Sequence, residues 1–182
     1  MGTAYAVVTA VGKDRVGIVD DLSAVVERAR CNIEESRMAV LGGDFAIILL
    51  ASGPESDAAQ LILDGPGLGA GLGLHIEARL TTAPREQGAG RPYVLESVSL
   101  DAPGIVHAVT DLLRRRGVNI EDMDTETVAA PWTGAPMFRM RGRLVVPHNV
   151  PIVELRHELE ALELERDLDI TLKPAAASGA ET

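Results

Sequence analysis

The hydrophobic and polar positions along the chain follow two periods, and their order predicts the same series of elements in each half. Short runs rich in β-branched residues predict strands, and apolar positions three and four apart predict helices. In the first half we expect strands at 4–11, 33–41, 45–51 and 74–81, with helices starting at Gly17 and near Pro54. In the second half we expect strands at 93–100, 118–129, 137–146 and 167–173, with helices at 104–116 and 151–165.

The first helix of each half has a single apolar stripe, which predicts that one side of it packs on a sheet. The stripe of the first half consists of Ile18, Val19, Leu22, Val25, Val26 and Ala29. The stripe of the second half consists of Ile105, Val106, Val109, Leu112 and Leu113.

Two of the predicted strands differ in pattern. Strand 45–51 is apolar throughout, which predicts that helices cover one of its faces and a partner sheet the other. Strand 137–146 alternates, with Arg139, Arg141 and Arg143 on its polar face. This arginine stripe is either a solvated face or a docking face for an acidic partner.

A glycine-rich run at 65–73 follows a predicted helix and precedes a strand. A dinucleotide-binding loop has the opposite order, because it follows a strand and opens a helix. The run also lacks the Lys-Ser/Thr ending of a phosphate-binding P-loop. We therefore expect a flexible connector here.

One segment of the chain occurs twice. Shifting residues 11–34 by 87 positions aligns them without a gap on residues 98–121, and Val, Asp, Gly, Ile, Val, Asn, Ile and Glu are identical. Average composition gives about one or two such matches, so the repeat is real. The repeated unit is a strand, a glycine turn, a helix, and an asparagine after the helix.

The repeat decides the domain organisation of the 182 residues, which by length alone fit one domain or two small ones. We expect two modules, and a polar linker between them without periodicity. The predicted division is a first module at 1–81, a linker at 82–92, a second module at 93–173 and a disordered tail at 174–182.

Composition excludes several functions. A net charge of −10 argues against direct binding to nucleic acid, whose phosphates need a basic face. The absence of an 18-residue apolar run predicts no membrane span, and no leader is apparent. The single cysteine, Cys31, fits a reducing cytoplasm. The four histidines lack metal-ligand spacing, and the sequence shows no paired carboxylates and no nucleophile–base arrangement. We therefore expect no metal, no cofactor and no catalytic residues.

The glycine turns are the first candidate site. The backbone N–H groups of a helix's first turn bind anions such as a carboxylate, and a glycine lets the ligand approach closely. A structural interpretation is that Gly17 and Gly104 only permit the turn, while Asp14 and Asp101 cap the helix and Pro103 presets its first residue. Spacing alone favours the structural interpretation.

The second candidates are Asn32 and Asn119. A side-chain amide can donate to a carboxylate and accept from an ammonium group, which is what an amino-acid zwitterion requires. Alternatively, each asparagine caps the C-terminus of its helix or adopts the left-handed backbone of the turn. The residues themselves leave both interpretations open.

The motif Asp-x-x-Gly-Ile-Val, with Asn-Ile fifteen positions after its glycine and present in tandem, resembles a pair of ACT domains. The plan of two modules and a short linker is similar to the glycine cleavage system transcriptional repressor family. The resemblance implies an α+β fold with two ferredoxin-like βαββαβ modules. Each would be a four-stranded antiparallel sheet with both helices on one face.

The resemblance also implies a function. We expect an amino-acid-binding regulatory protein of the cytoplasm, without catalytic activity, that acts in transcription regulation through a protein partner. Its ligand would be a small amino acid, with glycine as a candidate. The apolar strand 45–51 in addition predicts a homodimer, because a soluble monomer rarely exposes such a patch. The alternatives are an ACT-type interaction scaffold without a ligand, and the regulatory part of an amino-acid or folate metabolic enzyme.

The ligand-binding residues that the resemblance implies lie in the glycine turn and the Asn-Ile pair of each module. In the first module they are Asp14, Arg15, Val16, Gly17, Ile18, Asn32 and Ile33. In the second they are Asp101, Ala102, Pro103, Gly104, Ile105, Asn119 and Ile120. Because Arg15-Val16 replaces the Ala102-Pro103 of the second copy, we do not expect the two sites to be equivalent.

Overall fold

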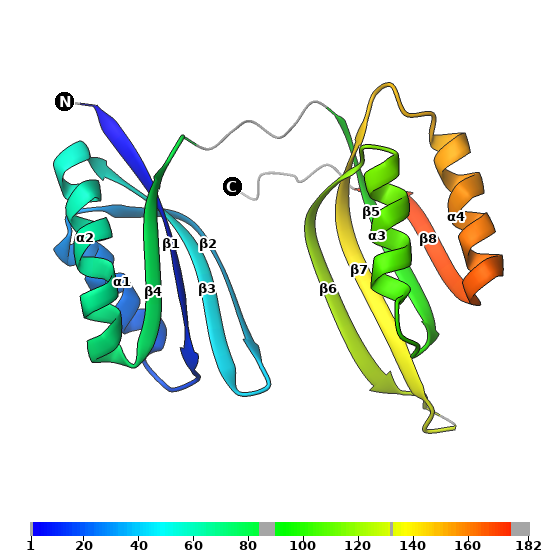
Figure 1. Ribbon diagram of the computed structural model, residues 1–182, viewed down its shortest axis with the longest axis horizontal. Helices are drawn as coiled ribbons and strands as arrows, with labels where there is room; N and C mark the ends of the chain where they lie inside the picture. The colour runs from blue at the N-terminus through cyan, green and yellow to red at the C-terminus, as the bar shows by residue number, and fades with distance from the viewer. Residues whose placement is uncertain (1, 84–89, 132, 176–182) are drawn as a thin grey trace. The chain divides into compact units, whose positions relative to one another are not determined.

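The computed structural model describes residues 2–83, 90–131 and 133–175. The chain forms two compact units, Met1–Glu86 and Gln87–Thr182. Each unit has four strands and two helices in the described residues (Figure 1). The predicted tail at 174–182 lies outside the described residues from position 176 on.

The first unit follows the βαββαβ order. Its sheet is antiparallel with strand order β2-β3-β1-β4. The elements are β1 (Thr3–Lys13), α1 (Ile18–Arg28), β2 (Asn32–Leu41), β3 (Asp44–Pro54), α2 (Glu55–Leu72) and β4 (Leu74–Thr81).

The second unit repeats this topology, with strand order β6-β7-β5-β8. The predicted α+β class with two ferredoxin-like modules is confirmed. The elements are β5 (Gly90–Leu100), α3 (Ile105–Arg115), β6 (Asn119–Ala129), β7 (Pro136–Pro147), α4 (Ile152–Arg166) and β8 (Leu168–Pro174). β5 therefore begins within the segment 82–92, which we expected to be a linker.

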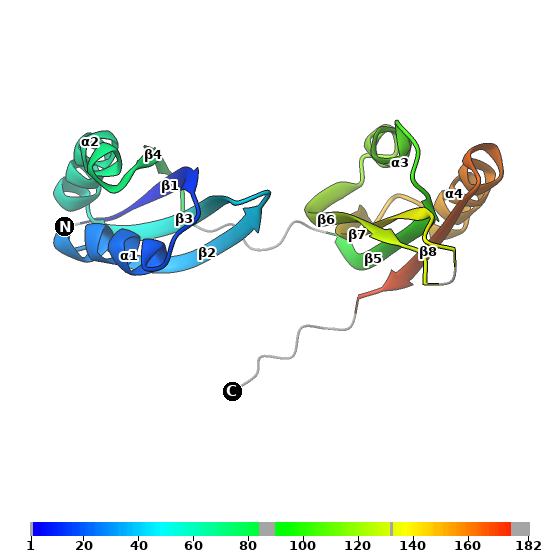
Figure 2. The ribbon, with the colours of Figure 1, turned by 90° about the horizontal axis from the view of Figure 1, so that it is seen from below.

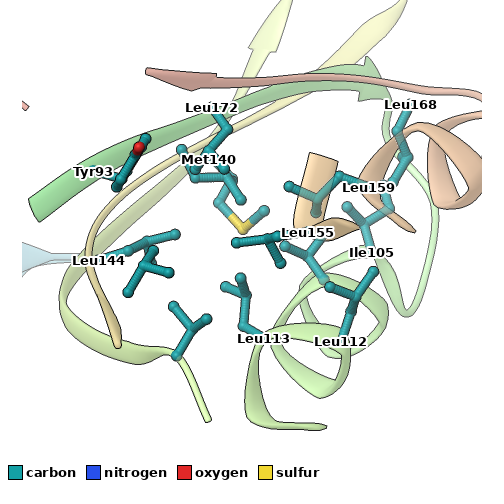
Figure 3. Packing of buried hydrophobic residues seen from close by; sticks show 14 of the residues in the cluster. Tyr93, Ile105, Leu112, Leu113, Met140, Leu144, Leu155, Leu159, Leu168 and Leu172 are labelled. Atoms are coloured by element: carbon teal, nitrogen blue, oxygen red, sulfur yellow. The ribbon is translucent and has the colours of Figure 1, made fainter. Parts of the chain in front are cut away.

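The cores form where the apolar stripes of the helices meet the inward face of each sheet. In the first unit α1 and α2 lie on the same side of the sheet (Figure 2). In the second unit, leucines of α3 and α4 pack against Met140 and Leu144 of the sheet (Figure 3). Burying each such side chain contributes about 1.5–3 kcal/mol.

The glycine-rich run is helical, so the expectation of a flexible connector was wrong. α2 continues through it to Leu72 and ends at Gly73. Packing explains this result, because Gly69 lies against β4 with no room for a side chain. A Cβ added at Gly69 would lie 2.7 Å from the carbonyl oxygen of Leu74 and 2.8 Å from the side chain of Ile76. The glycines let the helix approach β4 closely, and this contact overrides their low helix propensity.

Within the first unit, helices cover one face of β3, as its uniformly apolar sequence predicts, and the face predicted to meet a partner sheet is open. Phe45, Ile47 and Leu49 are buried beneath the helices, whereas Ile48 on the other face is 49% exposed. Val11 of the neighbouring β1 is also 49% exposed, and its register places it on the same face as Ile48. The open face of this sheet is therefore apolar at its centre.

The open face of the second sheet is charged instead, and its arginine stripe is paired within the unit. Arg139 lies 3.6 Å from Glu126, and Arg141 lies 3.6 Å from Glu96. A pocket of about 540 Å³ lies over these four side chains. Because their charges pair across neighbouring strands, the stripe fits a solvated sheet face.

Candidate functional site

The glycine turn of the first unit joins β1 to α1. Gly17 is the N-cap residue, with a φ of 88° that favours glycine, and its carbonyl accepts from the N–H of Asp21 at 3.0 Å. Asp14 makes no side-chain cap, because the helix start has no side-chain cap hydrogen bond. The backbone N–H of Asp14 instead donates to Gly43 in the β2–β3 hairpin, at 3.1 Å.

The second unit repeats this geometry. Gly104 caps α3 with a φ of 91°, and its carbonyl accepts from the N–H of Ala108 at 2.9 Å. The N–H of Asp101 donates to Pro136 at 3.0 Å, and again no side chain caps the helix. In both units, the interpretation of the aspartate as a helix cap was wrong.

The two turns differ in their side chains. Arg15 donates to Asp21 at 2.7 Å and to the carbonyl of Leu72, the last residue of α2, at 3.2 Å. It therefore ties the turn to both helices of the first unit. The second turn has Ala102-Pro103 in this place, and both residues are exposed.

The asparagines are not helix caps. The C-cap residues are Ala29 and Arg116, and neither is the predicted asparagine. Asn32 and Asn119 are instead the first residues of β2 and β6, and both are exposed. A side chain at the exposed start of a strand is accessible, so the ligand-binding interpretation stays a prediction.

Within one unit, the two halves of the predicted site lie far apart. Gly17 precedes α1, next to the β2–β3 hairpin, whereas Asn32 follows α1 and pairs with Ser52 at the opposite end of the sheet. α1 has 11 residues and is about 16 Å long at 1.5 Å per residue. A single amino acid is too small to span this length.

The Asn32 end of the first unit has a polar cluster that the sequence analysis missed. Glu34 stands at a β-bulge, where the register of β2 against β3 shifts between Ile33 and Glu35. Its carboxylate accepts from the amide of Asn32 at 3.2 Å and from the hydroxyl of Ser52 in a short hydrogen bond. These two donors lower the pKa of Glu34, with Ser52 as the larger cause.

The cluster borders a pocket of about 440 Å³. The pocket is lined by Thr3, Arg30, Asn32 and Ser52, among other residues. Arg30 also donates to Asp57 of α2 at 2.9 Å. The pocket thus combines a cation, a carboxamide and a hydroxyl, and the carboxylate of Glu34 is held by two of its lining residues.

The corresponding end of the second unit has a different arrangement. Glu121 stands at the same bulge of β6, but Arg143 pairs with it at 3.3 Å. Asn119 pairs along the sheet with Val145, so no hydroxyl occupies the position of Ser52. The two units therefore share the Asn-Ile-Glu sequence, but an arginine pairs with the glutamate only in the second unit, as far as the described residues show.

The described residues give no sign of metal chemistry or of a membrane span. Within 2–83, 90–131 and 133–175, no three histidine, cysteine or acidic side chains are grouped as metal ligands. No helix of the described chain is long and apolar enough to cross a membrane.

Comparison with known proteins agrees with this fold. The ACT domain matches residues 4–79. The glycine cleavage system transcriptional repressor of Escherichia coli (strain K12) is 36% identical over 159 residues, which are 87% of this chain and 83% of that protein. The same protein of Shigella flexneri matches equally.

Two crystal structures extend the similarity to both units. An unknown protein from Galdieria sulphuraria has a TM-score of 0.83 and 38% identity, over 96% of this chain and 100% of that one. A candidate glycine cleavage system transcriptional repressor has a TM-score of 0.73 and 25% identity, over 95% of this chain and 98% of that one.

Proposed function

The chain is a tandem ACT-domain protein of the glycine cleavage system transcriptional repressor family, and from this premise we propose that it is a regulatory protein that binds a small amino acid. The observation that carries the proposal is the extent of the similarity, which covers 87% of the chain at 36% identity. The two modules account for nearly all of the described chain, which supports a regulatory role.

Each unit offers two separate groups of polar atoms, one at each end of its first helix (α1 or α3), and each group suits a part of a small amino acid. The N–H groups at Gly17 and Gly104 suit a carboxylate, because they lie exposed at helix N-termini. Asn32 and Asn119 each offer both a donor and an acceptor. Glycine is our first candidate, since the relatives with this whole-chain similarity are named for the glycine cleavage system.

We expect the output to pass to a protein partner in the cytoplasm. The net charge of −10 repels the phosphate backbone of DNA, so direct operator binding is disfavoured. A homodimer is part of the proposal. Ile48 and Val11 leave an apolar area on the open face of the first sheet, and soluble monomers rarely expose large patches of this kind.

The experiment is a thermal shift assay of the full chain with each of the twenty amino acids, with nucleotides as the counter-set. A ligand that binds only the folded state adds about 2.7 kcal/mol at a hundred times its dissociation constant. We expect one or a few small amino acids to raise the melting temperature. If only a nucleotide does so, the proposal is wrong; if no amino acid does, the chain is better described as a scaffold without a ligand.

A further inference from the structure

Glu34 is a carboxylate without a cationic partner in the part of the chain that the structure describes. Among the residues described by the structure, its bonds come from the neutral side chains of Ser52 and Asn32, and no positive charge contributes to its lowered pKa. A carboxylate with two oxygens accepts up to about four hydrogen bonds, so it retains capacity for a further donor. An ammonium group supplies both that donor and the missing charge.

The internal repeat shows that this arrangement is particular to the first unit. Glu121 occupies the same place after Asn-Ile, and the guanidinium of Arg143 neutralises it. In the second unit, an arginine of the same unit therefore balances the charge of this carboxylate. The first unit does not, although the backbone bulge is the same.

Arg30 supplies the opposite charge at the same pocket. It has a left-handed backbone with a φ of 56°, which disfavours any side chain, and the corresponding residue of the second unit is Gly117 with a φ of 67°. Strain of this kind points to a function for the side chain. The guanidinium has five donors and its side chain is 80% exposed, so its bond to Asp57 leaves others available.

We propose that the pocket of the first unit beside Arg30, Asn32 and Ser52 binds the amino acid, with Glu34 accepting from the ligand ammonium and Arg30 donating to the ligand carboxylate. This inference rests on the proposed function and assigns its site to the first unit. The glycine turn of that unit lies at the other end of α1 and is not part of this pocket. The second unit, with its paired Glu121, is not an equivalent site.

The test is isothermal titration calorimetry of the full chain with glycine and, singly, the other nineteen amino acids. Glu34→Gln removes the charge but keeps the shape and the acceptor for Ser52. Glu121→Gln is the matched control at the same bulge of the second unit. We expect Glu34→Gln to weaken binding about ten- to a hundredfold, the range for a charged hydrogen-bonded pair, and Glu121→Gln to bind like the wild type.

Two analogues test the assignment of the two charges when glycine binds. Acetate lacks the ammonium group and glycinamide lacks the carboxylate, so each should bind far more weakly than glycine. Glu34→Gln should leave acetate binding unchanged, whereas Arg30→Gln should weaken it. Circular dichroism melts confirm that each variant is folded.

The outcomes separate this inference from the proposed function. If an amino acid binds the wild type and binds Glu34→Gln equally well, this inference is wrong and the proposed function stands. If Glu121→Gln weakens binding instead, the site belongs to the second unit. If no amino acid binds the wild type, both the proposed function and this inference fail.

Discussion

Arg30 and Gly117 occupy the same position of the internal repeat and share a left-handed backbone, with φ values of 56° and 67°. Glycine adopts this backbone readily, whereas a residue with a side chain loses about 1–2 kcal/mol there. The second unit thus has the residue that the turn prefers. The first unit departs from it at a position where the side chain lines a pocket.

The first prediction concerns Arg30→Gly. The substitution relieves about 1–2 kcal/mol of backbone strain. It also removes the ion-pair partner of Asp57, whose side chain is only 10% exposed, and a buried polar group that loses its partner costs about 1–3 kcal/mol. We therefore expect the two effects on the free energy of unfolding largely to cancel, while amino-acid binding weakens. Urea denaturation and calorimetry measure the two effects. A large loss of stability would show that the pair with Asp57 is a structural requirement.

The second prediction concerns Asn32→Ala and Asn119→Ala. Neither residue caps a helix and both are exposed, so each variant should lose at most about 1 kcal/mol of stability. Asn32→Ala should weaken amino-acid binding, because Asn32 orients Glu34, and Asn119→Ala should not. Melting temperature and affinity are measured together for each. A lower melting temperature with normal affinity for Asn32→Ala would identify it as structural.

The third prediction compares two glycines of the first unit that both have open space around them. A Cβ added at Gly17 or at Gly71 meets no atom within 4 Å. Gly17→Ala should destabilise the unit by about 1–2 kcal/mol, because its φ of 88° is left-handed. Gly71→Ala should stabilise it by about 0.5–1 kcal/mol, because Gly71 lies within α2. Urea denaturation gives both values, and effects of the same sign would contradict the argument.

The fourth prediction concerns acid sensitivity of the second unit. Arg116 at the end of α3 donates to Glu158 of α4 at 2.7 Å, and these hydrogen bonds hold the pKa of Glu158 below its usual 4.5. A carboxylate whose pKa is lower in the folded state than in the unfolded state stabilises the fold at pH values above its unfolded-state pKa. This stabilisation is lost as the pH falls through the folded-state pKa. Glu158→Gln should therefore be less stable than the wild type at pH 7, and the difference should shrink below pH 4.5. Melting curves from pH 7 to pH 3 test this, and a constant difference would contradict it.

The fifth prediction concerns the homodimer. If the open face of the first sheet is an interface between two copies, Ile48→Glu should produce a monomer, because a buried unpaired charge is costly. Val153→Glu on the surface of α4 is the control, since Val153 is also exposed, at 65%. Light scattering at micromolar concentration measures both. A wild-type monomer would rule out this interface, and loss of the dimer in both variants would place it elsewhere.

The fold could be predicted because the repeat and the hydrophobic periods are local in sequence. The segment expected as a strand at 74–81 is β4, and the stripes of the first helices face the cores. The exceptions are Val19 and Val106, which we placed in the stripes and which are 44% and 38% exposed. The helical glycine run could not be predicted, since its stability comes from close packing of Gly69 on Leu74 and Ile76. That contact outweighs the local propensity, which favours a loop.

The candidate site could be predicted only in part for the same reason. The glycine turns and the Asn-Ile pairs are contiguous motifs, so the repeat shows them. Ser52 meets Glu34 only through the register of β3 against β2 and the shift at the bulge. The sequence had one signal for the pocket, a difference between the two copies of the repeat: position 30 is arginine where position 117 is glycine.

The bond from Arg15 to the carbonyl of Leu72 has a consequence for the motions of the first unit. The end of α2 is rich in glycine and should open locally more often than the core strands, which lowers its protection against amide hydrogen exchange. Because Arg15 joins this end to the turn before α1, the two segments should open as one cooperative unit. Arg15→Ala should uncouple them, so that the amides after Gly17 and those near Gly71 exchange at independent rates.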